Sequence, residues 1–339
     1  MNDVVISAEN LKKTYKINKR SKGLFGHLAN LVFPKYEKKL AVNGVSFQIR
    51  KGEIVGFIGS NGAGKSTTIK MLTGILYPSD GRICVDGYDP YKDRKKYVKN
   101  IGVVFGQKSQ LAWDLPVIDS FELLKNIYRI PDKEYEKNLE LYSELLDLNS
   151  FINQPVRQLS LGQRMRADIV AALLHSPSII FFDEPTIGLD VLAKEKIRNF
   201  ILYLKKEKQI TMIFTTHDMS DIEKTCDHLI IIDKGEKIYD GSINEMLEVY
   251  GKNRKIVIDF GDENLQDITL DSDIQENVTI HQDKEDTSKW VLEFDSSVIK
   301  TDTLMKCLFE RYKVKDIKIQ DMDIENIVRD IYNGRITLS

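Results

Sequence analysis

The feature that most constrains the fold is a glycine-rich loop between a predicted strand and a predicted helix. Residues 53–58 are mostly apolar, and the pattern GxxxxGK[ST] follows them directly. Such a loop can bend so that successive backbone N–H groups and the N-terminus of the next helix face phosphate oxygens. We therefore expect it to bind nucleotide phosphates, with Lys65 neutralising the β and γ groups and the Ser66 hydroxyl offered to Mg²⁺. The loop residues are Gly59, Ser60, Asn61, Gly62, Ala63, Gly64, Lys65, Ser66 and Thr67.

Two adjacent acids follow another apolar run. Residues 179–182 are all apolar, and Asp183 and Glu184 come next. A buried parallel strand presents its ligand-binding side chains at its carboxyl end. Asp183 is therefore predicted to reach Mg²⁺, directly or through water, and Glu184 to polarise an attacking water. The alternative is a pair of solvated acids at an exposed strand end, and the presence of the phosphate loop in the same chain disfavours it.

The first three quarters of the chain alternate apolar, β-branched runs with helical patterns. Strands are predicted at 40–49, 53–58, 102–105, 178–182 and 211–215. This alternation predicts a largely parallel sheet covered by helices. Consecutive helices at 121–129 and 133–148 form a helical insertion between two of the strands.

The last part of the chain has a different pattern. Acidic residues outnumber basic ones after residue 252, and apolar and polar residues alternate over 255–260, 290–294 and 314–320. Alternation of this kind is typical of half-exposed strands. With helices at 302–312 and 324–332 covering one face of the sheet, residues 252–339 are predicted to form a small α+β accessory domain.

Residues 17–39 are predicted to be a short basic amphipathic insertion. Apolar residues recur at helical spacing, Pro34 ends the pattern, and Lys and Arg crowd both flanks. Its apolar stripe either docks on the neighbouring β-structure or lies against a membrane protein or lipid headgroups. The apolar residues are Leu24, Phe25, Leu28, Leu31 and Val32.

Composition excludes several classes of protein. The net charge of −2 over 339 residues gives no chain-wide attraction to nucleic acid or anionic lipid. Apolar runs are far shorter than the roughly 18 residues that span a bilayer, and the N-terminus lacks a signal-peptide pattern. We therefore expect a protein of the cytosol, which agrees with three cysteines that have no metal-binding or disulfide pattern.

Further motifs, in sequence order, give the chain a family resemblance. Gln107 follows the strand at 102–105, Leu159-Ser160-Leu161-Gly162-Gln163 precedes a helical pattern, Asp190 ends Ile187-Gly188-Leu189-Asp190, and His217 follows a strand. With the phosphate loop and the acid pair, this order over about residues 4–250 resembles the ABC-type ATPases. The resemblance implies an α/β P-loop NTPase cassette over 1–251. That cassette has a mostly parallel sheet core, an antiparallel β-subdomain and a helical subdomain at about 118–170.

The resemblance also implies roles for individual residues. Gln107 would sense the γ-phosphate and Mg²⁺ and His217 would contact the γ-phosphate, so both join Glu184 and Lys65 as catalytic candidates. Ser160, Gly162 and Gln163 would contact the ATP held by a second copy of the chain, and Asp190 would cross that dimer interface. Leu161 departs from the more usual glycine, which restricts the backbone there. Tyr15 either stacks on adenine or packs within the β-subdomain.

By the same resemblance, the chain is expected to be an ATP-binding and ATP-hydrolysing subunit of a membrane transporter. The segments around 104–116 and 157–166, and the ending Asp323-Ile324-Glu325-Asn326-Ile327-Val328, resemble ATPases of drug, antibiotic and polysaccharide exporters. The implied partners are separately encoded integral membrane permeases and a second cassette, with no nucleic acid. The implied location is the cytoplasmic face of the membrane. The alternative is a soluble ABC ATPase acting on ribosomes or nucleic acid, which one signature motif and the absence of sustained heptads disfavour.

Overall fold

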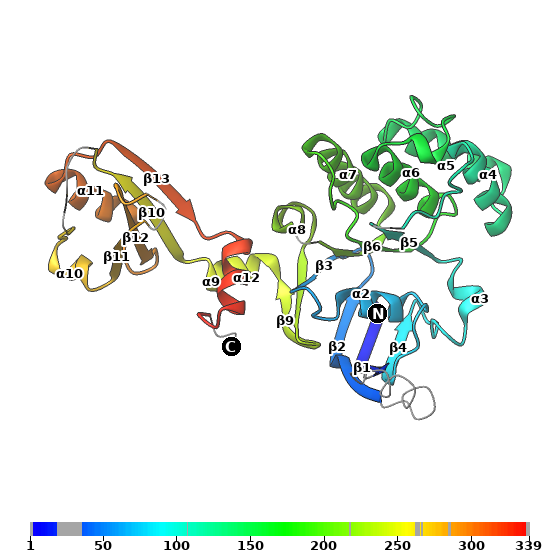
Figure 1. The fold of residues 1–339 in the computed structure, drawn as a ribbon, viewed down its shortest axis with the longest axis horizontal. Helices are drawn as coiled ribbons and strands as arrows, with labels where there is room; N and C mark the ends of the chain where they lie inside the picture. The colour runs from blue at the N-terminus through cyan, green and yellow to red at the C-terminus, as the bar shows by residue number, and fades with distance from the viewer. Residues whose placement is uncertain are drawn as a thin grey trace, which may run out of the picture. The chain divides into compact units, whose positions relative to one another are not determined.

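The computed structural model describes residues 3–18, 36–106, 108–216, 218–261, 265, 267–283 and 286–336. The chain divides into two compact units, Met1–Gly241 and Ser242–Ser339 (Figure 1). Helix α9 (Ile243–Tyr250) falls in the second unit, whereas the predicted boundary after Gly251 leaves it in the cassette. The functional domain limits at 1–251 and 252–339 stay a prediction.

A six-stranded sheet in the order β5-β6-β7-β3-β8-β9 forms the centre of the first unit. Its first five strands are mutually parallel, which confirms the predicted α/β class. Strand β3 is buried along its whole length because it lies between neighbours and has layers on both faces. The strands are β3 (Ile54–Gly59), β5 (Ile101–Phe105), β6 (Ile179–Asp183), β7 (Thr211–Thr215), β8 (His228–Asp233) and β9 (Glu236–Ser242).

One face of this sheet packs on a helix and on an antiparallel β-subdomain. Phe57 and Phe181 of the sheet share a buried core with Leu72 of α2 (Lys65–Leu72) and Val45 of the subdomain. The subdomain has the order β2-β1-β4, with β1 (Val4–Asn18), β2 (Tyr36–Arg50) and β4 (Asp80–Val85).

Helices cover the other face (Figure 1). Helix α6 approaches β5 closely, because a side chain at Gly102 would place its Cβ 2.6 Å from the carbonyl oxygen of Ala172. Ile222 packs over Gly56 of β3. These helices are α6 (Leu161–Leu173), α7 (Val191–Tyr203), which continues into the π-helical turn η2 (Leu204–Lys208), and α8 (Met219–Thr225).

The predicted helical insertion is present. Helices α4 (Val117–Tyr128) and α5 (Asp132–Leu145) lie within a few residues of the ranges predicted at 121–129 and 133–148. The 3-10 turn η1 (Val156–Gln158) then leads into α6, and the short helix α3 (Arg94–Tyr97) precedes β5. The described helices include none that is both long enough and apolar enough to cross a membrane.

The basic insertion interrupts a β-hairpin. Residues 19–35, which carry its predicted helix, lie outside the described part of the chain. Its two ends are strand rather than helix, because Ile17 pairs with Glu37 and Asn18 with Tyr36 in the antiparallel register of β1 and β2. The strand ends thus extend the hairpin past the limits predicted for the strand at 40–49.

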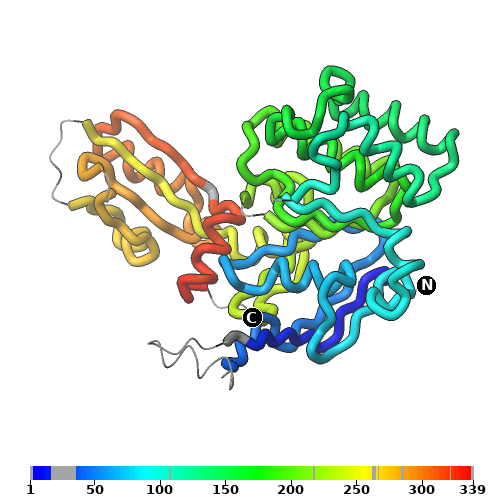
Figure 2. The backbone as a smooth tube through the Cα atoms, turned by 45° about the vertical axis from the view of Figure 1, so that its right-hand side comes forward, coloured from blue at the N-terminus to red at the C-terminus, as the bar shows by residue number. Residues whose placement is uncertain are grey.

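The second unit is the predicted α+β structure (Figure 2). Its sheet is antiparallel with the order β11-β12-β10-β13, and α11 buries Leu304 and Leu308 against Ile256 and Leu292. Helix α12 differs from the prediction, since it packs against α9 rather than joining α11 on the sheet. The elements are β10 (Asn253–Asp259), α10 (Ser272–Gln275), β11 (Val278–Gln282), β12 (Lys289–Asp295), α11 (Thr301–Arg311), β13 (Asp316–Asp321) and α12 (Ile324–Tyr332).

Candidate nucleotide site

The phosphate loop connects β3 to α2, as the sequence predicts. Gly64 has φ 111°, and a Cβ there would lie 2.6 Å from the carbonyl oxygen of Ala41, so only glycine fits. Lys65 is buried, and its Nζ donates hydrogen bonds to the carbonyl oxygens of Gly59 (2.6 Å) and Ser60 (3.3 Å). Burial lowers the pKa of Lys65, while the charges of Glu184 and Asp183 oppose that shift. The ammonium group is therefore held at the loop by backbone oxygens and nearby carboxylates.

Asp183 lies at the end of β6, beside the loop. The Ser66 hydroxyl donates to Asp183 Oδ1 (3.2 Å), and the Thr215 hydroxyl at the end of β7 donates to the same oxygen (2.9 Å). Hydroxyl and carboxylate oxygens are the hard ligands that Mg²⁺ prefers, and Mg²⁺ in nucleotide sites takes only one or two carboxylates from the protein. The donor set of Ser66 and Asp183 therefore fits this ion.

Glu184 is held in an unusual backbone conformation. Its φ is 58°, in the left-handed region that non-glycine residues seldom adopt, and its N–H donates to both the carbonyl oxygen (3.0 Å) and the hydroxyl (3.1 Å) of Thr215. A side chain at Gly106 would collide with the carbonyl oxygen of Glu184, and the Gly106 N–H donates to the Asp183 carbonyl (2.8 Å). The segment leading to position 107 is thus fixed against the acid pair. Gln107 itself lies outside the described residues.

A cavity of about 670 Å³ opens over the loop. Tyr15, predicted either to stack on adenine or to pack within the β-subdomain, lines it together with the loop and Glu184. Lys16 and Lys39 also line the cavity, and sequence reasoning did not predict them as part of the site. The antiparallel register of β1 and β2, which pairs Tyr15 with Lys39, brings both lysines to the cavity. The prediction of an amphipathic helix in this segment could not reveal that register.

The signature residues form a second group. Ser160 caps α6 and makes a reciprocal capping box with Gln163 (3.2 and 2.9 Å). Asp190 caps α7 by accepting a hydrogen bond from the N–H of Ala193 (2.9 Å), and the Cβ position of Gly162 lies 3.2 Å from the Ala193 Cβ. The starts of α6 and α7 therefore lie together.

The two groups do not share a cavity. Among the described residues that line the cavity over the phosphate loop there is no signature residue, nor Asp190. His217 lies outside the described residues, but its neighbours are described, and the Asp218 N–H donates to the Thr216 hydroxyl (3.0 Å). The predicted site residues that the structure describes thus lie on two separate surfaces of one chain.

Exposed apolar side chains surround the signature group. Val191 and Leu192 at the start of α7 are 73% and 72% exposed, and Leu161 at the start of α6 and Ile187 before Asp190 are exposed as well. The Leu161 side chain lies 3.2 Å from the Cβ position of Gly188, so the substituted signature residue packs on the segment leading to Asp190. Clustered exposed apolar residues are typical of protein–protein interfaces.

The chain is similar in sequence to known ABC transporter ATP-binding proteins. The family model for ABC transporters matches residues 42–187. The ABC transporter ATP-binding protein NatA of Bacillus subtilis is 38% identical over 208 residues, which cover 61% of this chain and 84% of NatA. The linearmycin resistance ATP-binding protein LnrL of the same organism is 35% identical, covering 64% of this chain and 69% of LnrL.

Solved structures of ABC cassettes share the fold of this chain. The cassette MJ0796, in a dimeric post-hydrolysis state bound to ADP and Pi, matches with a TM-score of 0.59 and 28% identity. The match covers 70% of this chain and 98% of that cassette.

Proposed function

Because the chain belongs to the ABC transporter ATP-binding proteins, we propose that it powers a membrane exporter through an ATP-driven cycle of dimer closure and opening. The observation that carries the dimer is the separation of the site residues into two groups on one chain. Lys65, Ser66 and Asp183 line or adjoin one cavity, while Ser160 and Asp190 lie at a different, apolar surface. A second copy, placed head to tail, can supply the missing group to each cavity.

The residues of one chain would then hold and position ATP. Lys65 neutralises the β- and γ-phosphates, the loop N–H groups bind their oxygens, and Tyr15 stacks on the adenine. Ser66 and Asp183, together with Gln107 as the family resemblance implies, would hold a Mg²⁺ ion, which would supply further neutralisation of phosphate charge. Glu184 orients and polarises the attacking water, and His217 contacts the γ-phosphate. Ser160, Gly162 and Gln163 of the other chain would close the site.

The test of this assignment is Glu184→Gln. A positioned general base contributes about 10² to 10⁴ in rate, so turnover should fall by at least about 100-fold while ATP binding persists. The trapped ATP should also shift the purified protein from monomer to dimer in size-exclusion chromatography with light scattering. Glu195→Gln, an exposed carboxylate of α7, is the matched control and should behave as wild type. ATPase activity of the Glu184→Gln variant equal to wild type would remove the assignment.

We further propose that the chain serves export and binds a membrane-spanning partner. The relative LnrL is named for resistance to linearmycin, and the helix capped by Asp323 resembles the ending of drug-exporter ATPases. The chain would act at the cytoplasmic face of the membrane, bound to separately encoded permeases. Purification of the tagged chain from detergent-solubilised membranes should recover a membrane-spanning partner. Recovery of ribosomes or nucleic acid instead would support the rival class of soluble ABC ATPases.

A further inference from the structure

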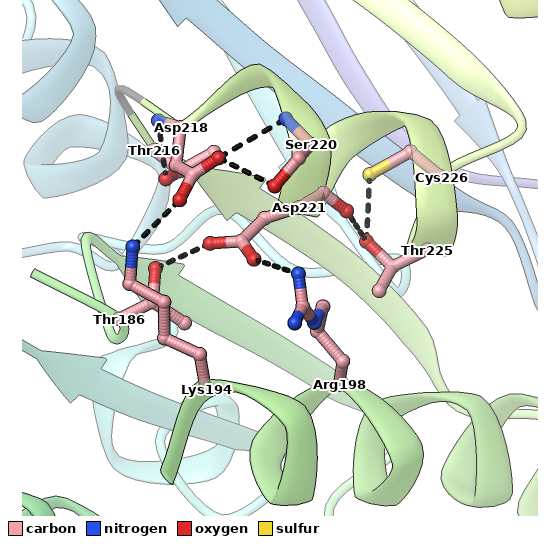
Figure 3. Close-up of polar contacts among 9 residues, drawn as sticks. All are labelled: Thr186, Lys194, Arg198, Thr216, Asp218, Ser220, Asp221, Thr225 and Cys226. Carbon is pink, nitrogen blue, oxygen red and sulfur yellow. Dashed lines mark hydrogen bonds and ion pairs between the residues drawn. The ribbon is translucent and has the colours of Figure 1, made fainter. Parts of the chain in front are cut away.

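Two ion pairs join helices α7 and α8 within the first unit (Figure 3). Lys194 Nζ lies 2.6 Å from Asp218 Oδ2, and Arg198 Nη1 lies 3.2 Å from Asp221 Oδ1. The two basic residues are one turn apart on α7, and the two acidic residues lie at the start of α8. Two ion pairs at separate points along α7 therefore fix both the distance between the two helices and their relative rotation.

Asp221 is the buried centre of this network. Its side chain is fully buried, and its Oδ2 accepts a hydrogen bond from the Thr186 hydroxyl (2.7 Å) while Oδ1 faces Arg198. Burial raises the pKa of Asp221, an effect that Thr186, Arg198 and Lys194 oppose and the charge of Asp218 reinforces. Apolar side chains of similar volume would fill such a space at no greater cost in stability. The polar groups instead fix one geometry for three segments.

Each of the three segments lies next to a predicted residue of the nucleotide site. Thr186 lies two residues after Glu184, and α7 is the helix that Asp190 caps. On α8, Asp218 accepts hydrogen bonds from the N–H (3.1 Å) and hydroxyl (2.7 Å) of Ser220 and binds Thr216 through its own N–H (3.0 Å). The residues on both sides of position 217 are therefore tied to the same helix pair (Figure 3).

We propose that Asp221 is a positioning residue that, through Thr186 and Arg198, makes the segment around position 217 and the Asp190 end of α7 move as one body. This inference rests on the proposed dimer, in which position 217 faces the chain's own ATP and Asp190 faces the partner chain. A γ-phosphate bound at one site would then shift the element that reaches towards the other site. The network thereby couples hydrolysis at the two sites.

The test replaces the buried pair by apolar residues in the double variant Asp221→Leu/Arg198→Met. ATP affinity should stay within about threefold of wild type, because no loop residue changes. The kcat should fall by about tenfold or more, and the Hill coefficient for ATP, above 1 in wild type, should fall to 1. Lys205→Met/Asp227→Leu is the matched control. It removes an ion pair of 2.5 Å between η2 and the residue after the C-cap of α8, at the ends of the two helices opposite to Asp190 and position 217, and both parameters should be unchanged.

Thr186→Val is a second variant that keeps the test decisive if the double variant folds poorly. It removes one hydroxyl with little change of volume, leaves a buried carboxylate oxygen without its donor, and should lower kcat and the Hill coefficient in the same direction. Wild-type kcat and cooperativity in a folded variant, or a wild-type Hill coefficient of 1, would overturn the coupling. The proposed function itself has a different test: it would be disproved by ATP turnover that persists in the Glu184→Gln variant.

Discussion

At the scale of single residues, Asp168 on α6 joins the signature helix to the loop that follows position 107. Its Oδ1 accepts hydrogen bonds from the Ser109 hydroxyl (2.9 Å) and the Gln110 N–H (3.0 Å), and the side chain is 4% exposed. Burial is the largest influence and raises the pKa of Asp168 to about 6, although the two hydrogen bonds oppose it. At neutral pH Asp168 is therefore ionised in the folded protein, but its ionisation costs more free energy there than in the unfolded chain.

Asp168→Asn should remove this cost, because the amide oxygen can accept the same two hydrogen bonds without a charge. The folded-state pKa lies above the unfolded value of about 3.9, so the folded wild type binds more protons between about pH 4 and pH 6. Its free energy of unfolding must fall as pH rises through that window, and the loss is complete above it. The variant should be more stable by about 2 kcal/mol at pH 7.5, with the difference vanishing towards pH 4. Denaturant unfolding at several pH values measures this, and a pH-independent difference would contradict it.

Residues with a local mechanism were predictable from sequence, and residues recruited by tertiary packing were not. Lys65, Ser66 and the acid pair lie where the strand–loop–helix pattern places them. Thr215, which donates to Asp183, and the buried Asp221 come from separate segments whose proximity depends on strand order. No sequence spacing shows that β7 lies beside β6 with its end next to the acids.

At the scale of elements, the continuously apolar strands β3, β6 and β7 were predicted to within a residue or two, and weakly patterned elements were missed. Strand β7 has the predicted limits because every one of its residues is buried. Strand β11 has the same length as β7 but escaped prediction because it is an edge strand with mixed exposure. Helix α9 and its packing against α12 were not predicted. The apolar face of α12 shows that the helix packs against something, but it does not show which element is the partner.

The signature helix has two explanations that one experiment separates. The capping box of Ser160 and Gln163 stabilises α6 by itself, typically by about 1 kcal/mol, whereas the proposed dimer also uses Ser160 for the partner's ATP. Ser160→Arg and Glu184→Gln should each abolish turnover as pure proteins. Mixed in equal amounts, they should regain activity, because a mixed dimer has one site with an intact Glu184 from one chain and an intact Ser160 from the other. Failure of every mixing ratio to restore activity, with dimers formed, would mean that the signature acts within its own chain.

At the scale of the whole molecule, each unit has its own hydrophobic core. The first core joins the two sheets and α2, and the second joins α11 to its antiparallel sheet. The sequence predicted two domains from a change in strand pattern, with a limit after Gly251, whereas the compact units divide after Gly241, where the sequence carries no local signal. Separate cores lead us to expect separate unfolding of the two units.

Calorimetry of the Glu184→Gln protein, which retains ATP, tests this expectation. ATP at about 100 times its Kd should stabilise the first unit by about 2.7 kcal/mol and raise one transition by roughly 5–10 °C, leaving the other in place. Leu292→Ala should act in the opposite sense on the other transition alone, because Leu292 is fully buried in the second core and its truncation costs about 2–5 kcal/mol. A single transition that responds to both ATP and Leu292→Ala would show instead that the two cores unfold together, so that the accessory unit takes part in the stability of the nucleotide site.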